Sequence, residues 1–298
     1  MRRFFARRGV MEVETPLLSA ATVTDPHLAS LETRYAGPGA PDGGRLFLQT
    51  SPEFAMKRLL AAGCGPIYQI GKAFRDGEAG GRHNPEFTLL EWYRPGFDHH
   101  ALMDEVEALL AEVLATAAAE RCTYATLFEE RLGVDPHAAS AEALAAAARS
   151  AGLDPALGLD REGLLHLLMA LALEPSLGRG RPTFVYDFPA SQAALARVRP
   201  GPPPVAERFE AFVEGVELAN GFNELGDPAE QRRRFAADLA RRRELGLPEV
   251  PIDERLLEAL AAGLPSCAGV ALGVDRLVML AAGASRLDEV LAFPIGRA

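Results

Sequence analysis

The alternation of apolar and polar residues is clearest between Phe74 and Arg94, where it predicts two strands joined by a polar loop. Apolar residues lead up to Phe74, glycines at 77, 80 and 81 interrupt them, and a β-rich segment follows Pro85. A period of two gives one face of the second strand an aromatic ring, a carboxylate and a phenol. Such a face suits a small cationic molecule beside a phosphate, and a solvent-exposed edge hairpin is the alternative. The residues concerned are Phe87, Leu89, Glu91 and Tyr93, with Arg75 and His83 near the entrance.

A strand over residues 46–49 is predicted to lead directly into a helix over residues 53–62. Ser51 is expected to cap this helix, and Pro52 suits the first helical position because proline has a fixed φ and no N–H. Glu53 stabilises the positive end of the helix dipole in one interpretation and contacts a substrate ammonium in the other.

Residues 100–119 are predicted to form an amphipathic helix, after which the composition changes. Alanine and leucine dominate residues 121–199, which carry no evident chemistry. We therefore expect a helical insertion at about 121–200, followed by a proline-rich spacer at 200–204.

A second hairpin is predicted around Glu214-Gly215, a two-residue turn that would place Phe212 opposite Glu217. Glu210 and Glu217 then share a face as diagonal neighbours, about 7–8 Å apart at the backbone. Two carboxylates this close repel each other, so we expect a bound cation; oxygen ligands favour Mg²⁺, which brings phosphates with it. A solvated acidic edge is the alternative. Beyond Gly221 an irregular backbone is expected to turn three further side chains towards a ligand: Asn220, Phe222 and Glu224.

Residues 227–245 are predicted to form a charged helix with arginines at 232–234 and 241–243. A solvated face explains these arginines, and contact with an acidic protein or RNA is the alternative. The net charge of −10 argues against a large nucleic-acid footprint, which requires a basic face.

Residues 269–280 are predicted to form a small-residue strand that runs into a helix, with Arg276 in the first helical turn. Glycine permits close approach of the backbone, and a guanidinium presents a fork to phosphate. This segment completes a predicted nucleotide site with two arginines, a carboxylate pair for a metal and a ring for a base: Arg75, Arg276, Glu210, Glu217 and Phe87.

Composition limits the class of protein. The chain has 298 residues, of which 48% are hydrophobic and 24% charged, enough to form a globular core. No apolar run reaches the roughly 18 residues of a membrane span, so no membrane association is expected. The three cysteines at 64, 122 and 267 are far apart, which disfavours a zinc site or disulfides and favours the cytoplasm. None of them has a neighbour that would make it a covalent nucleophile.

Three segments resemble the motifs of class II aminoacyl-tRNA synthetases. Residues 9–16 are similar to the end of motif 1, residues 74–93 to motif 2 and residues 269–280 to motif 3. The runs Arg-His-Asn-Pro-Glu-Phe-Thr at 82–88 and Glu-Leu-Ala-Asn-Gly-Phe-Asn-Glu-Leu at 217–225 resemble the lysyl branch. The resemblance implies one α+β catalytic domain over residues 1–298, with an antiparallel sheet flanked by helices, and a homodimer.

The resemblance also implies roles for single residues. Arg75 would hold the α-phosphate of ATP, and Phe87 and Arg276 would sandwich adenine. Gly77 stands where motif 2 usually has glutamate. Glu78 would take over the contact of that glutamate by a small shift of the loop. The implied ATP contacts are Arg75, Asp76, Gly77, His83, Asn84, Phe87, Glu217, Leu218, Gly273 and Arg276. Glu210 and Glu217 would hold Mg²⁺. The implied contacts to a lysine-like substrate are Ser51, Pro52, Glu53, Glu91, Tyr93, Asn220, Glu224 and Ala271.

Two features resemble a paralogous family, the elongation factor P–(R)-β-lysine ligases. The chain opens at motif 1, whereas lysyl-tRNA synthetases carry an N-terminal anticodon-binding domain before that motif. Residues 183–193 and 269–273 are similar to the paralogue, and Ala271 stands where the synthetases usually have glycine.

This resemblance implies that (R)-β-lysine is activated as an adenylate and passed to a lysine of elongation factor P, without stable tRNA binding. A stand-alone lysyl-adenylate or lysyl-tRNA synthetase-like enzyme is one alternative. An inactive, amino-acid-binding regulator is the other, although Arg75, Arg276 and the glutamate pair are all present.

Overall fold

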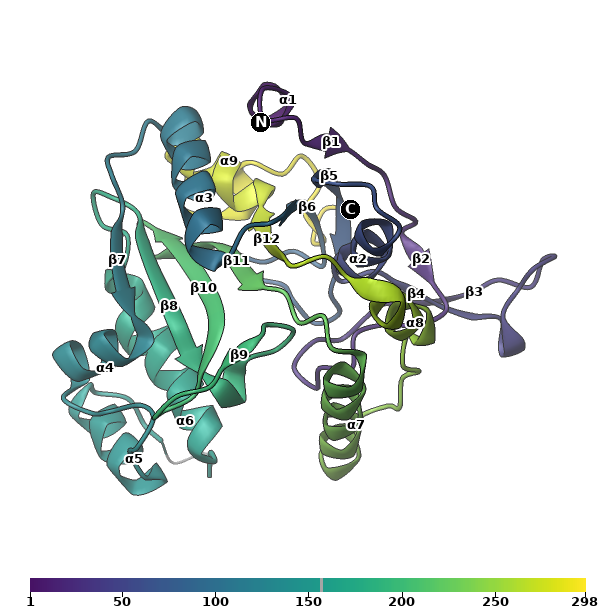
Figure 1. The fold of residues 1–298 in the computed structure, drawn as a ribbon. Coiled ribbons are helices and arrows are strands. Elements are labelled where there is room, and N and C mark those ends of the chain that lie inside the picture. The colour runs from purple at the N-terminus through teal and green to yellow at the C-terminus, as the bar shows by residue number, and fades with distance from the viewer. Residues whose placement is uncertain (156–157) are drawn as a thin grey trace. The chain divides into compact units, whose positions relative to one another are not determined.

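The computed structural model describes residues 1–155 and 158–298, which form two compact units (Figure 1). The first unit comprises Met1–Gly96, Leu225–Cys267 and Ala271–Ala298. The second comprises Phe97–Glu224 and Ala268–Val270. Both units combine a sheet with helices, so the α+β class is confirmed, whereas the single domain over 1–298 stays a prediction.

The sheet of the first unit is organised around the predicted hairpin. Strand β5 (Ile67–Phe74) pairs antiparallel with β6 (Glu86–Pro95), and β1 (Met11–Glu12) lies parallel to β5. The register places Ile67 opposite Tyr93 and Phe74 opposite Glu86. A smaller sheet has the order β2 (Leu18–Ser19), β4 (Arg45–Leu48), β3 (Glu32–Arg34).

Helices of the first unit begin close to their predicted positions. Pro52, and not Ser51, occupies the N-cap of the helix at 53, yet Ser51 Oγ still accepts a hydrogen bond from the N–H of Glu53 at 3.0 Å. Strand β12 (Cys267–Gly273), whose residues 268–270 belong to the second unit, runs directly into a helix as predicted. The helices are α1 (Arg2–Ala6), α2 (Glu53–Ala61), α7 (Pro228–Glu244), α8 (Glu254–Gly263) and α9 (Val274–Ala281), with short 3₁₀ turns at Asp42–Gly44 and Leu287–Glu289.

The second unit carries a sheet with the order β11-β10-β8-β7, and β9 lies beside β10. Strands β7 and β8 are parallel, so the sheets of the protein are mixed and not antiparallel throughout. The elements are α3 (His99–Leu114), β7 (Glu120–Thr123), α4 (Tyr124–Leu132), α5 (Ala141–Ser150), α6 (Arg161–Leu167), a π-helical turn (Leu168–Leu173), 3₁₀ turns at Glu174–Ser176 and Ala190–Gln192, β8 (Thr183–Pro189), β9 (Val198–Arg199), β10 (Val205–Val213) and β11 (Val216–Asn223).

The prediction that residues 121–200 are helical throughout is therefore wrong at both ends of the segment. β7 and β8 lie within it, because β-branched and aromatic residues such as those of Thr183–Phe188 favour a strand. The alanine- and leucine-rich composition of the whole segment masks these short runs. Part of this segment, residues 156–157, lies outside the described residues.

The hairpin between β10 and β11 turns at Glu214 and Gly215, which both have positive φ, 52° and 70°. This conformation suits a two-residue turn between twisted strands. The predicted pairing of Phe212 with Glu217 is confirmed. A bulge between Ala211 and Phe212 then shifts the register, so that Glu210 lies opposite Asn220. The prediction of an irregular backbone beyond Gly221 is wrong, because β11 continues as a strand to Asn223. The pairing is distorted instead at the bulge between Ala211 and Phe212 of β10.

The arginine-rich helix α7 exposes most of its arginines to solvent and pairs them with neighbouring carboxylates, in agreement with the interpretation as a solvated face. Arg232 pairs with Glu254, Arg233 and Arg234 pair with Glu230, Arg241 pairs with Glu244, and Arg243 pairs with Glu249. Arg242 is buried and donates to the backbone carbonyls of Pro248 and Asp25. Intramolecular partners thus account for these arginines.

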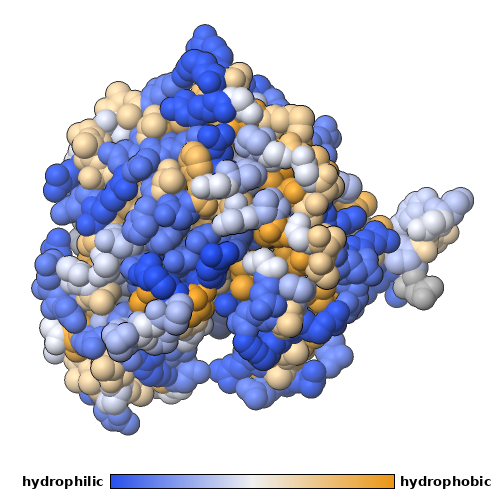
Figure 2. All heavy atoms as spheres, in the orientation of Figure 1, coloured by the Kyte–Doolittle hydropathy of each residue, from blue (hydrophilic) through white to orange (hydrophobic). Residues whose placement is uncertain are grey.

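No helix among residues 1–155 and 158–298 is long and apolar enough to cross a membrane. Hydrophilic side chains are interspersed with hydrophobic ones over the face seen in Figure 2.

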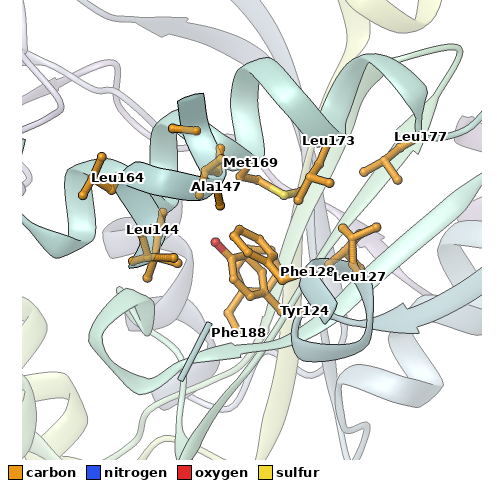
Figure 3. Close-up of a cluster of buried hydrophobic side chains, with 14 of the residues drawn as sticks. Tyr124, Leu127, Phe128, Leu144, Ala147, Leu164, Met169, Leu173, Leu177 and Phe188 are labelled. Atoms are coloured by element: carbon orange, nitrogen blue, oxygen red, sulfur yellow. The ribbon is translucent and has the colours of Figure 1, made fainter. Parts of the chain in front are cut away.

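Helices α4, α5 and α6 of the second unit pack a hydrophobic cluster against residues of β8 (Figure 3). Tyr124 and Phe128 stack with ring centroids 4.5 Å apart, and Phe188 of β8 packs on Tyr124 at 4.8 Å. Leu144 and Leu164 complete the contact from α5 and α6 and are buried. This cluster anchors the helices to the sheet that carries the acidic hairpin.

Leu144→Ala is expected to lower the free energy of unfolding by about 2–5 kcal/mol, because it removes buried methyl groups and leaves a cavity. Leu171→Ala is the matched control, since Leu171 is 56% exposed in the same helical region and its loss should change stability by less than about 1 kcal/mol. Urea denaturation measures both. Equal effects of the two substitutions would contradict the described core.

Candidate active site

Motif 2 places a guanidinium over an aromatic ring in the first unit. Arg75 follows β5, and its guanidinium carbon lies 5.1 Å from the centre of the Phe87 ring. Its terminal nitrogen is 3.6 Å from the carboxylate of Glu78, while its Nε is buried without a hydrogen-bond partner among the described residues. A buried donor with no acceptor is costly, so this face of Arg75 is suited to an anion.

The loop after Arg75 explains the glycine that departs from the usual motif. Gly77 has a φ of 78°, a conformation that glycine adopts without strain. The turn brings the carboxylate of Glu78 within 3.6 Å of Arg75, while its replacement of the motif 2 glutamate stays a prediction. The N–H of Asp76 donates to the carbonyl of Ala29 at 2.8 Å, which fixes the start of the loop.

Motif 3 is joined to the motif 2 loop through Arg276. Its Nε donates to the carbonyl of Arg82 at 3.2 Å, and its Nη2 lies 2.7 Å from Nε2 of His83. Asp275, one residue earlier in α9, accepts from the N–H of Thr88 at 2.7 Å. A Cβ built on Gly273 would lie 3.6–3.8 Å from the Arg276 side chain. The structure thus brings His83, Gly273 and Arg276 together.

Asn84 is held by the loop and by the C-terminal segment. Its amide nitrogen donates to the carbonyl of Glu86 at 2.6 Å, and its amide oxygen accepts from the N–H of Ile295 at 2.9 Å. A cavity of 610 Å³ lies beside it, lined by His83 and Asn84 from the loop and by Arg286 and Ile295 from the C-terminal segment. Sequence reasoning missed this C-terminal contribution, which has no motif to mark it.

The predicted substrate face contains a fully buried carboxylate. Glu91 of β6 is 2% exposed, and its two oxygens accept hydrogen bonds from Ser51 Oγ and Tyr93 Oη, both at 2.7 Å. The structure therefore brings Ser51, Glu91 and Tyr93 together as predicted. Both hydroxyls donate to the carboxylate and fix its oxygens, an arrangement that suits a cationic ligand in a buried setting.

Glu53 forms an ion pair with a buried lysine, a contact that the sequence did not lead us to expect. Lys57, one turn later in α2, is 1% exposed, and its ammonium lies 2.6 Å from the Glu53 carboxylate. The spacing of four residues between a glutamate and a lysine was the available signal. A substrate contact of Glu53 stays a prediction, as do those of Pro52 and of Ala271, which shares a half-buried face of β12 with Gly273.

The second unit carries the acidic hairpin. Glu210 accepts a hydrogen bond from Arg208, two residues earlier on β10, and both side chains are mostly buried. Burial and the negative charge of Glu217 raise the pKa of Glu210 to about 7, although Arg208 acts in the opposite direction. On the neighbouring strand Asn220 carries a buried amide oxygen without a hydrogen-bond partner among the described residues, while Leu218 and Glu224 are buried.

These two glutamates fit a magnesium ion that is shared with phosphates. No group of three or more His, Cys, Asp or Glu residues that could hold a metal occurs in the described part of the chain. A pair of carboxylates supplies part of the oxygen shell of Mg²⁺, and nucleotide phosphates and water ordinarily supply the remainder. Burial is the main cause of the raised pKa of Glu210, and the negative charge of Glu217 adds to it, so a bound cation would be favoured at this pair.

Cysteine chemistry does not compete with this site. Cys64, Cys122 and Cys267 form no disulfide in the part of the chain that the structure describes. Burial and nearby glutamates raise the pKa of Cys122 to about 11, the opposite of an activated nucleophile.

Comparison with known proteins agrees with these motifs. Residues 1–297 match the family described as tRNA synthetases class II (D, K and N). An elongation factor P–(R)-β-lysine ligase of Vibrio cholerae serotype O1 is 58% identical over 300 residues, which cover 100% of this chain and 93% of the relative. Proteins of the same name from Proteus mirabilis and Yersinia enterocolitica are 56% and 55% identical, each over 100% of this chain and 92% of the relative.

Glu210→Gln is expected to change how the stability of the metal-free protein depends on pH. The folded pKa of Glu210 lies above its ordinary value of 4.5, so its contribution to stability is complete below pH 4.5 and is lost as the pH rises through about 7. The loss is at most about 3 kcal/mol. Relative to the unmodified protein, Glu210→Gln should therefore be more stable at pH 8 than at pH 4.5.

Urea denaturation in EDTA at pH 4.5 and pH 8 measures this difference. Glu214→Gln, at the exposed turn of the same hairpin, is the control and should preserve the original pH dependence. A Glu210→Gln protein with the same pH dependence as the control would contradict the assignment.

Proposed function

The chain belongs to the class II tRNA synthetase family (D, K and N), and on this premise we propose that it attaches (R)-β-lysine to elongation factor P. Within this family it is a ligase that forms an aminoacyl-adenylate. The proposed substrate and acceptor rest on one observation: the chain is 58% identical, over its whole length, to a ligase named for this reaction.

The first step is activation of the amino acid. A carboxylate oxygen of (R)-β-lysine attacks the α-phosphorus of ATP, which gives the adenylate and releases pyrophosphate. The enzyme contributes mainly by positioning and by neutralising charge. Arg75 holds the α-phosphate with its Nε, which has no acceptor among the described residues. Arg276 binds adenine and the phosphate tail, and Phe87 offers its ring to the base.

The other nucleotide contacts follow from the same assignment. They are Asp76, Gly77, His83, Asn84, Glu217, Leu218 and Gly273. Mg²⁺, when bound by Glu210 and Glu217, neutralises phosphate charge. Glu210 and Glu217 lie on the paired strands β10 and β11 of the hairpin.

The amino acid is recognised by its two ammonium groups. Each buried ammonium needs a charged or polar acceptor, and the carboxylate of Glu91, fixed by Ser51 and Tyr93, is such an acceptor. Glu53 provides a second carboxylate after rearrangement of its contact with Lys57. Asn220, Glu224, Pro52 and Ala271 complete the proposed contacts.

The second step transfers the acyl group. The ε-amine of a lysine in elongation factor P attacks the carbonyl carbon of the adenylate, an amide forms, and AMP leaves. No enzyme-bound acyl intermediate is needed, in keeping with the raised pKa of the Cys122 thiol. We propose that the protein acts as a homodimer and without tRNA.

ATP–pyrophosphate exchange tests the activation step directly. (R)-β-lysine and L-α-lysine are compared without tRNA, and a strong preference for (R)-β-lysine is expected. Preference for L-α-lysine would indicate a lysyl-tRNA synthetase-like enzyme, and the absence of exchange with both would indicate a binding protein without this activity.

Glu91→Gln is expected to raise KM for (R)-β-lysine in pyrophosphate exchange by about 10–100-fold, because a charge-assisted hydrogen bond to an ammonium becomes neutral. KM for ATP should change little. Glu86→Gln, an exposed residue of the same strand that pairs with Lys72, is the control. An unchanged KM for (R)-β-lysine in Glu91→Gln would remove Glu91 from the amino-acid site.

Arg276→Ala is expected to lower the rate of adenylate formation by at least about 100-fold, because it removes a cationic donor to the phosphates. Circular dichroism should show an intact fold. Arg232→Ala, which removes an exposed arginine paired with Glu254, should retain activity. A folded Arg276→Ala protein of normal activity would refute the assignment of motif 3.

A further inference from the structure

A buried arginine stands beside the proposed metal carboxylates, and the family motifs give it no role. Arg208 lies two residues before Glu210 on β10, and its side chain is 16% exposed. One terminal nitrogen donates to the carbonyl of Gln192 at 2.9 Å, and the other donates to Glu210 Oε1. The guanidinium is therefore fixed at one end by backbone and presented to the carboxylate at the other.

Two aromatic rings hold the same guanidinium in place. Its carbon lies 4.6 Å from the centre of the Phe188 ring and 5.9 Å from that of Phe222. Cation–π contacts of this kind favour a charged group where water is scarce. Arg208 Nε is buried without a hydrogen-bond partner among the described residues, a cost that the other contacts offset. The arginine is thus positioned by the fold for Glu210 and not for bulk solvent.

A carboxylate oxygen that accepts from a guanidinium is less available to a metal ion. A divalent cation that binds Glu210 must displace or share this contact, and it also meets the positive charge of Arg208. We propose that Arg208 is an internal counter-ion of the Glu210–Glu217 pair and weakens the binding of free divalent cations, an inference that rests on the proposed magnesium site. The site then favours a cation that arrives with additional ligands, namely nucleotide phosphates.

The test measures Mn²⁺ binding to the whole protein at pH 8 without nucleotide, by the electron paramagnetic resonance signal of free Mn²⁺. Arg208→Gln is expected to bind Mn²⁺ about tenfold more tightly than the unmodified protein, because a charge-assisted hydrogen bond and a like charge are removed. Arg199→Gln is the matched control, since Arg199 pairs with Asp187 and Glu207 and should leave Mn²⁺ affinity unchanged.

Two further variants keep the inference falsifiable. Arg208→Lys retains a charge but has no fork to bridge Gln192 and Glu210, so a smaller gain of about threefold is expected, even if Arg208→Gln fails to fold. Arg208→Gln combined with Glu210→Gln should lose the gain. Equal or weaker Mn²⁺ binding in folded Arg208 variants would overturn the inference.

Failure of this inference is distinguishable from failure of the proposed function. Magnesium-dependent pyrophosphate exchange by the unmodified protein, together with unchanged Mn²⁺ affinity in the Arg208 variants, would refute only the counter-ion role. A gain of affinity that persists after Glu210→Gln would refute both the counter-ion role and the proposed metal site.

Discussion

The need of a buried carboxylate for a positive or donating partner governs the arrangement of this protein. Each unit meets that need with its own groups: hydroxyls of Ser51 and Tyr93 at Glu91 in the first, and the guanidinium of Arg208 at Glu210 in the second. The partners differ in strength, since hydroxyl donors preserve the charge of a carboxylate, whereas a guanidinium compensates it. Glu91, whose oxygens accept from two hydroxyls, is therefore better suited to a cationic ligand than Glu210, which already pairs with a guanidinium.

This constraint also explains why the proposed chemistry needs no nucleophilic side chain. Adenylate formation and acyl transfer both use nucleophiles brought by the substrates, so the protein has to place charges and exclude water. Arg75 meets this requirement with a buried donor that has no acceptor in residues 1–155 and 158–298, and Arg276 is oriented by the carbonyl of Arg82. The raised pKa of Cys122 fits a mechanism in which thiols play no part.

Much of the architecture could be predicted because its signals are local. The turn at Glu214-Gly215 requires positive φ at adjacent residues, and the strand-to-helix junction before Arg276 follows from small residues and periodicity. The bulge near Ala211 could not be predicted, since it depends on how two strands pair. The role of Arg208 depends on Gln192, which is distant in sequence, whereas Lys57 was within reach of a simple helix-spacing argument.

The most direct test of the account is the intact mass of elongation factor P after incubation with this protein, ATP, Mg²⁺ and (R)-β-lysine, without tRNA. The account predicts an increase by one β-lysyl group, located on a single lysine by peptide mapping and absent when ATP is omitted. Elongation factor P that remains unmodified, while pyrophosphate exchange proceeds with (R)-β-lysine, would contradict the proposed acceptor.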